Sequence, residues 1–527
     1  MSGLDILVLV LYFGGICIAG VYFSRRNTTT EAYFLGNRNF PAWAIGISLV
    51  GTSISSISFL AFPGDAFKTG WLRLLPSLSM PIAILIASIW ILPFFRSRNF
   101  VSAFEYLELR FGPSTRLYGA IAFIIAQLMR IGFILFLLSL LIHEFSGLPL
   151  WVCIVFSGIF VSFYTILGGF EAVVWTDVVQ TIVLLIGGVF CLYVIVDALP
   201  GGFSQIISEA TAADKFSMSE FNVESQTFKS PLWTISLTKK TALMMLLVGL
   251  VNWLTEYSSN QNVIQRYCAS RTTRDAQKAM WICTISSIPI WSFFMFLGTA
   301  LWVFYKQFPT PETDGMLVGG IVNGIEMKAD QVLPFFIVEQ LPNGIAGLVI
   351  AAVMAAAMSS LDSSINAIST VSITDIVKRH LKPGQEDSYY LKLAHRIAMA
   401  TSVFMIVAAI VFAYSPGKTA QDTYTVMVAI TAGGLLGLFM LGFVTKSGDG
   451  RSIAWAIGCT IAFTLYRVLE GRGFVPAIPI DSYYTGIVGH VLMFVIGWVL
   501  GSFMQTTPRD LTNLTLWTRQ TTDSEST

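Results

Sequence analysis

Residues 46–58 read GISLVGTSISSIS, which places six hydroxyl side chains and two glycines within thirteen residues of an otherwise apolar segment. A helix with this composition can unwind locally, because its carbonyls and hydroxyls can then face a cation or a polar ligand. Close packing of helices through small residues is the alternative explanation. The stretch therefore indicates either a tightly packed helix or an interrupted helix that forms part of a binding site.

The chain around this stretch is strongly apolar. Of its 527 residues, 54% are hydrophobic and 12% are charged, whereas a soluble domain carries roughly 25% charged residues. The 32 Lys plus Arg nearly balance the 31 Asp plus Glu, so the charge gives no sign of a nucleic-acid partner. The six cysteines contain no C-x-x-C pair and predict neither a disulfide framework nor a zinc site. The partner that the composition does predict is the lipid bilayer.

Apolar runs long enough to cross a bilayer recur along the chain, and uninterrupted runs of this length form helices in lipid. The first run precedes Arg25 and Arg26 and lacks a cleavage pattern, so we expect a retained helix rather than a signal peptide. Thirteen spans are expected, at residues 4–23, 41–63, 71–95, 117–142, 149–167, 172–198, 241–264, 279–304, 345–371, 391–414, 423–445, 452–468 and 485–504.

The basic residues predict how these spans are oriented. An odd number of spans places the termini on opposite sides, and the predicted loops on one side hold most of the Lys and Arg, Arg266 among them. The positive-inside rule makes these loops cytoplasmic. We expect an N-terminus outside, a C-terminus inside, a transporter domain over residues 1–507 and a short cytoplasmic tail over 508–527.

Several classes of protein lack support in the sequence. A phosphate-binding loop for ATP is absent, so any pumping must use an ion gradient. Only four His are present, without a nucleophile elbow or a metal-ligand motif, so we expect no enzyme. A membrane-embedded solute sensor is an alternative, but we expect no attached signalling domain.

Carboxylates occur in two of the spans. Ser359, Asp362 and Ser363 share one helical face, and their hard oxygen atoms suit sodium. Asp177 and Gln180 likewise lie one turn apart on one face. The alternatives are a structural hydrogen bond for Asp362 and a helix cap for Asp177.

Arg130 is the only Lys or Arg that we place near the middle of a span. A guanidinium in this position needs an anion, and its planar fork matches a carboxylate. One alternative is a permanent ion pair with Glu256 or Asp362. The other is that the transported solute supplies the anion.

Residues 168–180, GGFEAVVWTDVVQ, resemble the signature of the sodium:solute symporter family. Residues 260–266 and 356–363 support the resemblance, which extends over about residues 4–504. It implies an all-α, polytopic membrane protein with a LeuT-type fold of two five-helix inverted repeats. These repeats would cover residues 41–198 and 241–445, with flanking helices at 3–23, 452–468 and 485–504.

The resemblance also implies two sodium sites, with one or two Na+ coupled per cycle. The first would use the backbone oxygens of Gly51, Ile54 and Ala356 with the hydroxyls of Ser359 and Ser360. The second would use Asp177, Ser359, Asp362 and Ser363. Asp362 replaces the serine or small residue usual in the family, and it could bind either sodium or a proton.

The substrate site is similar to that of the bacterial sialic acid branch of the family. Arg130 matches the arginine that holds the substrate carboxylate, beside Ser53, Ser55 and Ser58. Arg73 and Ser77 depart from the branch, which has an aromatic residue and a glutamine there.

This branch implies a multi-pass symporter of the cell membrane, plasma or inner, without an obligatory protein partner. It would couple inward Na+ movement to uptake of a carboxylated sugar such as sialic acid (N-acetylneuraminate) by alternating access. A Na+-coupled symporter of neutral sugars or polyols is the alternative.

Overall fold

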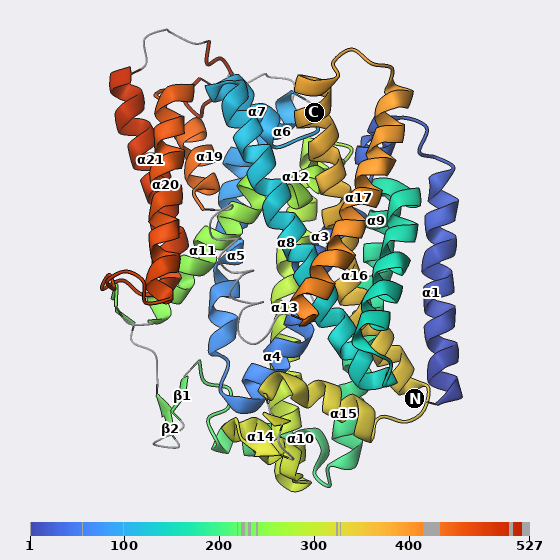
Figure 1. Ribbon diagram of the computed structural model, residues 1–527. Helices are drawn as coiled ribbons and strands as arrows, with labels where there is room; N and C mark the ends of the chain where they lie inside the picture. Colours follow the sequence, from blue (N-terminus) through green and yellow to red (C-terminus); the bar gives the residue numbers. More distant parts are fainter. Residues whose placement is uncertain are drawn as a thin grey trace.

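The computed structural model of the chain is a bundle of long helices, with short helices and two small hairpins gathered at one end (Figure 1). It describes residues 2–54, 56–98, 100–218, 220–222, 227–229, 233–234, 236–238, 241–322, 325–326, 328–414, 433–504 and 510–518.

The first half of the chain contains α1 (Gly3–Ser24), α2 (Thr30–Leu35), α3 (Ala42–Ser53), α4 (Ser56–Lys68), a 3-10 segment (Leu72–Ser79), α5 (Met80–Ile86), a π-helical segment (Ala87–Ile91), α6 (Leu92–Ser97), α7 (Phe104–Phe111), α8 (Pro113–Ser146), α9 (Leu150–Ala198), α10 (Gly202–Ala212) and the hairpin of β1 (Glu220–Asn222) with β2 (Thr227–Lys229).

The second half contains α11 (Ala242–Ser259), α12 (Gln261–Cys268), α13 (Thr273–Gln307), α14 (Pro311–Val318), the hairpin of β3 (Ile321–Val322) with β4 (Ile325–Glu326), α15 (Val332–Gln340), α16 (Ile345–Val371), a π-helical segment (Ser372–Leu381), α17 (Asp387–Tyr414), α19 (Leu435–Val444), α20 (Gly450–Gly471) and α21 (Thr485–Met504).

Nine of the described helices are long and apolar enough to cross a bilayer, and the bent pair α3 and α4 makes a tenth candidate. The expected spans 149–167 and 172–198 are two helices that meet at a kink at Gly169, where φ is 57°, and both carry the label α9. A Cβ on Gly169 would lie 2.7 Å from a ring carbon of Tyr33, so glycine suits this position. Residues 423–432 of the expected span 423–445 lie outside the described residues, and α19 lies within the described remainder.

Among the described membrane-spanning helices, α16 is the one most enclosed by its neighbours, because all its residues from Val349 to Val371 are buried. It packs most extensively against α9 and also contacts α1, α8 and α17. Polar side chains on α9 and α16 therefore meet in the interior of the bundle, where each one needs a partner.

The two described ends of the chain lie at opposite ends of the bundle (Figure 1). The N-terminus lies on the side of α10, α14 and α15, which come from the two longest segments between spans. At the other end, the described tail residues 510–518 dock on the bundle. The Tyr106 hydroxyl donates to the Leu514 carbonyl at 2.9 Å, and the Trp517 indole donates to the Val444 carbonyl at 2.5 Å.

Candidate functional site

The hydroxyl-rich stretch forms an interrupted helix. α3 ends at Ser53, Ile54 has an extended backbone with φ −101° and ψ 101°, and α4 resumes at Ser56. The axes of α3 and α4 differ by 57°. The last carbonyls of a helix lack N–H partners within it, so the end of α3 offers oxygen atoms to neighbouring elements. The structure thus places an interruption where the sequence indicated one.

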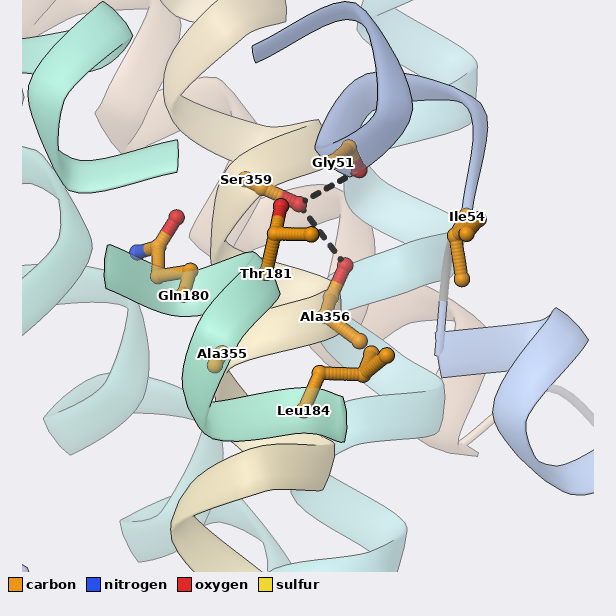
Figure 2. A pocket seen from close by; sticks show the side chains of 8 residues that line it. All are labelled: Gly51, Ile54, Gln180, Thr181, Leu184, Ala355, Ala356 and Ser359. Atoms are coloured by element: carbon orange, nitrogen blue, oxygen red, sulfur yellow. Dashed lines mark hydrogen bonds between the residues drawn. The ribbon is translucent and has the colours of Figure 1, made fainter. Parts of the chain in front are cut away.

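Ser359 of α16 connects to the end of α3. Its hydroxyl donates to the Gly51 carbonyl at 2.9 Å and lies 3.1 Å from the Ala356 carbonyl. The residues that carry these oxygen atoms line a cavity of about 10 Å³, which is room for one guest the size of a water molecule. Figure 2 shows the residues that line this cavity, which are Gly51, Ile54, Gln180, Thr181, Leu184, Ala355, Ala356 and Ser359.

Four of the five residues expected at the first sodium site therefore surround one small cavity. The fifth, Ser360, lies outside the lining, but its hydroxyl is buried without a hydrogen-bond partner among the described residues. The sequence analysis missed Thr181, whose hydroxyl points toward Ser359 in Figure 2. Its spacing of four residues from Asp177 is the signal that could have found it.

The residues expected at the second sodium site lie next to this cavity, but an arginine is among them. Arg266 of α12 donates to the Asp177 carboxylate at 2.7 Å and to the Ser363 hydroxyl at 2.5 Å. The Ser48 hydroxyl donates to the same Asp177 oxygen at 2.5 Å. The other Asp177 oxygen, Oδ1, is buried without a hydrogen-bond partner in the described part of the chain.

Arg266 was assigned to a loop in the sequence analysis, and the structure corrects this assignment. Its side chain is 1% exposed and that of Asp177 is 0% exposed. α12 is short and polar. The expected apolar span 241–264 therefore ends within α12, and the residues after it were assigned to a loop. Arg266 is therefore an interior cation, as Arg130 was expected to be.

Asp362 lies beside this cluster with different partners. It accepts a hydrogen bond from the Tyr164 hydroxyl at 2.8 Å and one from the Ser363 backbone N–H at 2.6 Å. Asp362 forms no ion pair with any described residue. Two carboxylates thus share the surroundings of one guanidinium, and both are fully buried.

Arg130 lies at the middle of α8 and is half-buried. It forms neither a hydrogen bond nor an ion pair with any described residue, so the alternative of a permanent pair with Glu256 or Asp362 is not seen. Glu256 instead accepts a hydrogen bond from the Asn260 amide at 2.7 Å.

The serines expected around the solute are placed in part. Ser53 and Ser58 are half-buried, and the Ser53 hydroxyl lies 3.9 Å from the Cys283 sulfur. Ser55 lies outside the described residues. Arg73, which departs from the family pattern, forms an ion pair of 2.5 Å with Asp65 and lies over the Phe62 ring.

Membrane-spanning helices that enclose a helix break and a small interior cavity define a class, the polytopic membrane transporters with an all-helical fold. The model of the sodium:solute symporter family matches residues 33–447. The chain belongs to the sodium:solute symporter family, for which sodium is the coupling ion.

Relatives with named functions cover nearly the whole chain. The sodium/sialic acid symporter SiaT of Proteus mirabilis is 32% identical over 93% of both chains. The sodium/sialic acid symporter NanT of Aliivibrio fischeri is 30% identical over 94% of this chain and 92% of its own.

Solved structures agree with these relatives. A substrate-bound, outward-open Na+-coupled sialic acid symporter superposes with a TM-score of 0.83 at 28% identity, over 96% of this chain and 99% of the other. Mhp1, a transporter of the nucleobase-cation-symport-1 family, shares the fold with a TM-score of 0.57 at 13% identity.

Proposed function

We propose that this protein is a secondary active symporter of the cell membrane that couples inward Na+ movement to the uptake of sialic acid. Two relatives that match more than nine-tenths of the chain are sodium/sialic acid symporters. The observation that carries the substrate class is the half-buried guanidinium of Arg130, which has no partner among the described residues. An interior cation of this kind is costly unless an anion reaches it, and a sugar carboxylate supplies that anion.

The first sodium ion would bind at the cavity beside the end of α3. Gly51, Ile54 and Ala356 would supply backbone oxygens, and Ser359 and Ser360 would supply hydroxyls. The 10 Å³ cavity and the two carbonyls near the Ser359 hydroxyl support this assignment. Unwound carbonyls at helix ends are common sodium ligands in transporters.

A second cation would bind among Asp177, Ser359, Asp362 and Ser363. If both carboxylates are ionised, they exceed the single charge of Arg266 by one, and a buried excess charge needs a counter-ion. The unpartnered Oδ1 of Asp177 supports a cation on that side. Sodium or a proton could fill this role, and because each carries one positive charge, the dependence of uptake on pH rather than the transport current separates them.

Ser53, Ser55 and Ser58 would hydrogen-bond the sugar while Arg130 holds its carboxylate. Sodium at the first site would fix the broken helix and so order these serines before the solute arrives. Ordering the site first raises the affinity for the solute, and by linkage the solute raises the affinity for sodium equally. Each sodium that moves inward through 100 mV contributes about 2.3 kcal/mol.

The architecture that we propose has thirteen spans and two inverted repeats, over residues 41–198 and 241–445. The breaks at Ile54 and at Asn260, where φ is −87° and ψ is 115°, support this repeat. Each break interrupts the first helix of one proposed half. The N-terminus would lie outside and the tail over 508–527 inside, as the opposite placement of the ends in Figure 1 allows.

Uptake by proteoliposomes tests this function. Purified protein with an inward sodium gradient should accumulate radiolabelled N-acetylneuraminate and should fail to do so with potassium in place of sodium. Two sodium ions with one monoanion should produce an inward current, whereas one sodium ion would transport no net charge. Uptake of neutral sugars instead would favour a neutral sugar symporter. Solute binding without uptake would indicate a sensor.

A further inference from the structure

The two interrupted helices of the bundle both reach one cysteine of α13, Cys283, which is fully buried. The first interrupted helix breaks after Ser53, and the second breaks at Asn260, directly after α11. α13 packs along both halves of the first, α3 and α4. The surroundings of Cys283 therefore include the ends of two helices that are expected to form the binding sites.

The Cys283 sulfur contacts three hydroxyl groups. The Tyr257 hydroxyl, in the last turn of α11, donates to the sulfur at 3.4 Å. The Ser53 hydroxyl, at the end of α3, lies 3.9 Å from it, and the Ser287 hydroxyl, one turn further along α13, lies 3.7 Å from it. A thiol can both accept and donate weak hydrogen bonds. This one sulfur atom therefore connects the last turns of both interrupted helices.

The backbone around these contacts is closely packed. A Cβ on Gly46 of α3 would lie 2.7 Å from the Cβ of Ile282, the residue before Cys283. On the other side, the Tyr267 hydroxyl of α12 donates to the Tyr257 carbonyl at 3.3 Å and so bridges the break at Asn260. Closely packed interiors transmit strain. A shift of α3 or of α12 therefore reaches the contacts at Cys283.

Ser53 links this cysteine to both proposed ligands. The Gly51 carbonyl, two residues earlier, accepts the hydrogen bond from Ser359 at the proposed first sodium site. Ser53 itself is one of the serines proposed to bind the sugar. Cys283 does not line the sodium cavity. It lies instead behind the segment that the ion and the sugar share.

We propose that Cys283 is a positioning residue that couples sodium binding to solute binding. Sodium at the end of α3 fixes Ser53 against the sulfur, and the sulfur holds Tyr257 beside the second break. Because sulfur is a weak hydrogen-bond partner, these contacts can break and re-form as the helices move. The proposal rests on the proposed function and adds to it the residue that links its two ligands.

The sodium dependence of solute affinity tests the proposal. N-acetylneuraminate binding to detergent-purified protein is measured in low and in saturating sodium, and the ratio of the two dissociation constants is the coupling factor. Cys283→Ala should lower this factor about 3- to 10-fold, as expected for a residue that mediates coupling without touching a ligand. Cys191→Ala, at an equally buried cysteine of α9, is the matched control and should leave the factor unchanged. An unchanged factor in Cys283→Ala would overturn the proposal.

Tyr257→Phe separates a hydrogen-bond effect from a packing effect, because it removes only the hydroxyl that donates to Cys283. It should also lower the coupling factor. Adding it to Cys283→Ala should cause no further loss, since both changes remove the same interaction. Cys283→Ser keeps a hydrogen-bonding group and should restore part of the coupling. Losses that simply add in the double variant would contradict a shared interaction.

Thiol labelling gives a readout that needs no solute. Modification of Cys283 by N-ethylmaleimide, followed by mass spectrometry of the peptide that contains it, should be slower in sodium than in potassium, because sodium holds Ser53 against the sulfur. Equal rates in the two salts would overturn the proposal.

Failure of the proposed function would look different. If the wild type does not bind N-acetylneuraminate in sodium, the sialic acid assignment fails, whereas slower labelling in sodium still supports the link between the sodium site and Cys283. If Cys283→Ala does not fold, the coupling factor of Tyr257→Phe and the labelling rates of the wild type decide the question.

Discussion

Two interior arginines of this protein have contrasting surroundings. The Arg266 guanidinium is surrounded by an aspartate and two serines at 2.5–2.8 Å. The Arg130 guanidinium has no such contacts among the described residues. An arginine whose hydrogen-bond donors all have protein partners holds helices together, whereas an arginine with free donors is available to a ligand. Substitution of each residue should therefore have different consequences.

Arg130→Ala should abolish sialic acid uptake with little loss of thermal stability. The removed charge-assisted hydrogen bonds are worth about 1.5–3 kcal/mol, or roughly 10- to 150-fold in affinity. Binding affinity and melting temperature measured on the same preparation check this. Arg266→Ala is the comparison, and it should lower the melting temperature because it leaves Asp177 buried and unpaired. A large loss of stability in Arg130→Ala would indicate a structural ion pair.

Ser359→Ala should raise the sodium concentration for half-maximal uptake by about tenfold, as expected for loss of one ligand worth about 1.4 kcal/mol. Maximal uptake in saturating sodium should change little. Ser364→Ala on the same helix is the control, because the Ser364 hydroxyl donates to Gln127 of α8 at 3.0 Å, away from the cavity. A similar sodium effect in both variants would argue against a specific sodium ligand at Ser359.

At the scale of elements, the broken helix packs by close backbone contact. Gly298 of α13 faces the Pro63 carbonyl of α4, and a Cβ on Gly298 would lie 2.2 Å from that oxygen. Because α4 begins at the break, this contact fixes the second half of the interrupted helix to α13. Neither the carbonyl nor the helix axis can shift cheaply.

Gly298→Ala should therefore destabilise the protein by about 1–3 kcal/mol through overpacking. The change should be visible as a lower melting temperature in a thermal unfolding assay. Gly458→Ala in α20 is the matched control, because a Cβ there has nothing within 4 Å. The control should leave stability unchanged or raise it slightly, since alanine favours a helix. Equal melting temperatures for the two variants would contradict the close contact.

We expect the thermal stability of the protein to depend on pH through Glu108, which lies where α7 meets the ends of α8 and the π-helical segment after α16. Burial raises the pKa of Glu108, but the guanidinium groups of Arg379 and Arg116 outweigh it and hold the pKa below its ordinary value of 4.5. A depressed carboxyl pKa stabilises the fold above pH 4.5, and this contribution is lost as the pH falls through the folded pKa. The melting temperature of Glu108→Gln should therefore fall less on acidification than that of the wild type. Melting temperatures that fall in parallel with pH in Glu108→Gln and the wild type would contradict this role of Glu108.

The elements were predictable to the extent that they are long and apolar. The expected run 279–304 lies within α13 and the run 117–142 within α8, because lipid demands uninterrupted apolar helices. The boundary between the expected spans 149–167 and 172–198 coincides with the kink at Gly169. The π-helical segments depend on tertiary packing, and hydropathy carries no signal for them.

The candidate site was predictable where its residues share one helix or one family motif. Ser359 and the end of α3 were expected together, and the structure brings them together. The interior position of Arg266 was not predicted, because its hydrogen bonds to Asp177 and Ser363 join residues 89 and 97 positions apart in sequence. Only the fold brings α12 between α9 and α16.

At the scale of the whole molecule, the ends of the bundle should face different compartments. In a Cys459→Ser background, a membrane-impermeant maleimide applied to intact cells should label Asp314→Cys in α14. It should leave Glu386→Cys, just before α17, unlabelled until the cells are lysed, because that loop is predicted to be cytoplasmic. The reverse labelling pattern would invert the proposed orientation.

The docked tail gives the chain a late step in its synthesis. The hydrogen bond from Tyr106 to Leu514 joins residues 408 positions apart. At about 5–20 residues per second, roughly 20–80 s pass between the synthesis of α7 and the arrival of its last partner. Until then this end of the bundle lacks that contact. Its packing is therefore completed only after every described span has been synthesised.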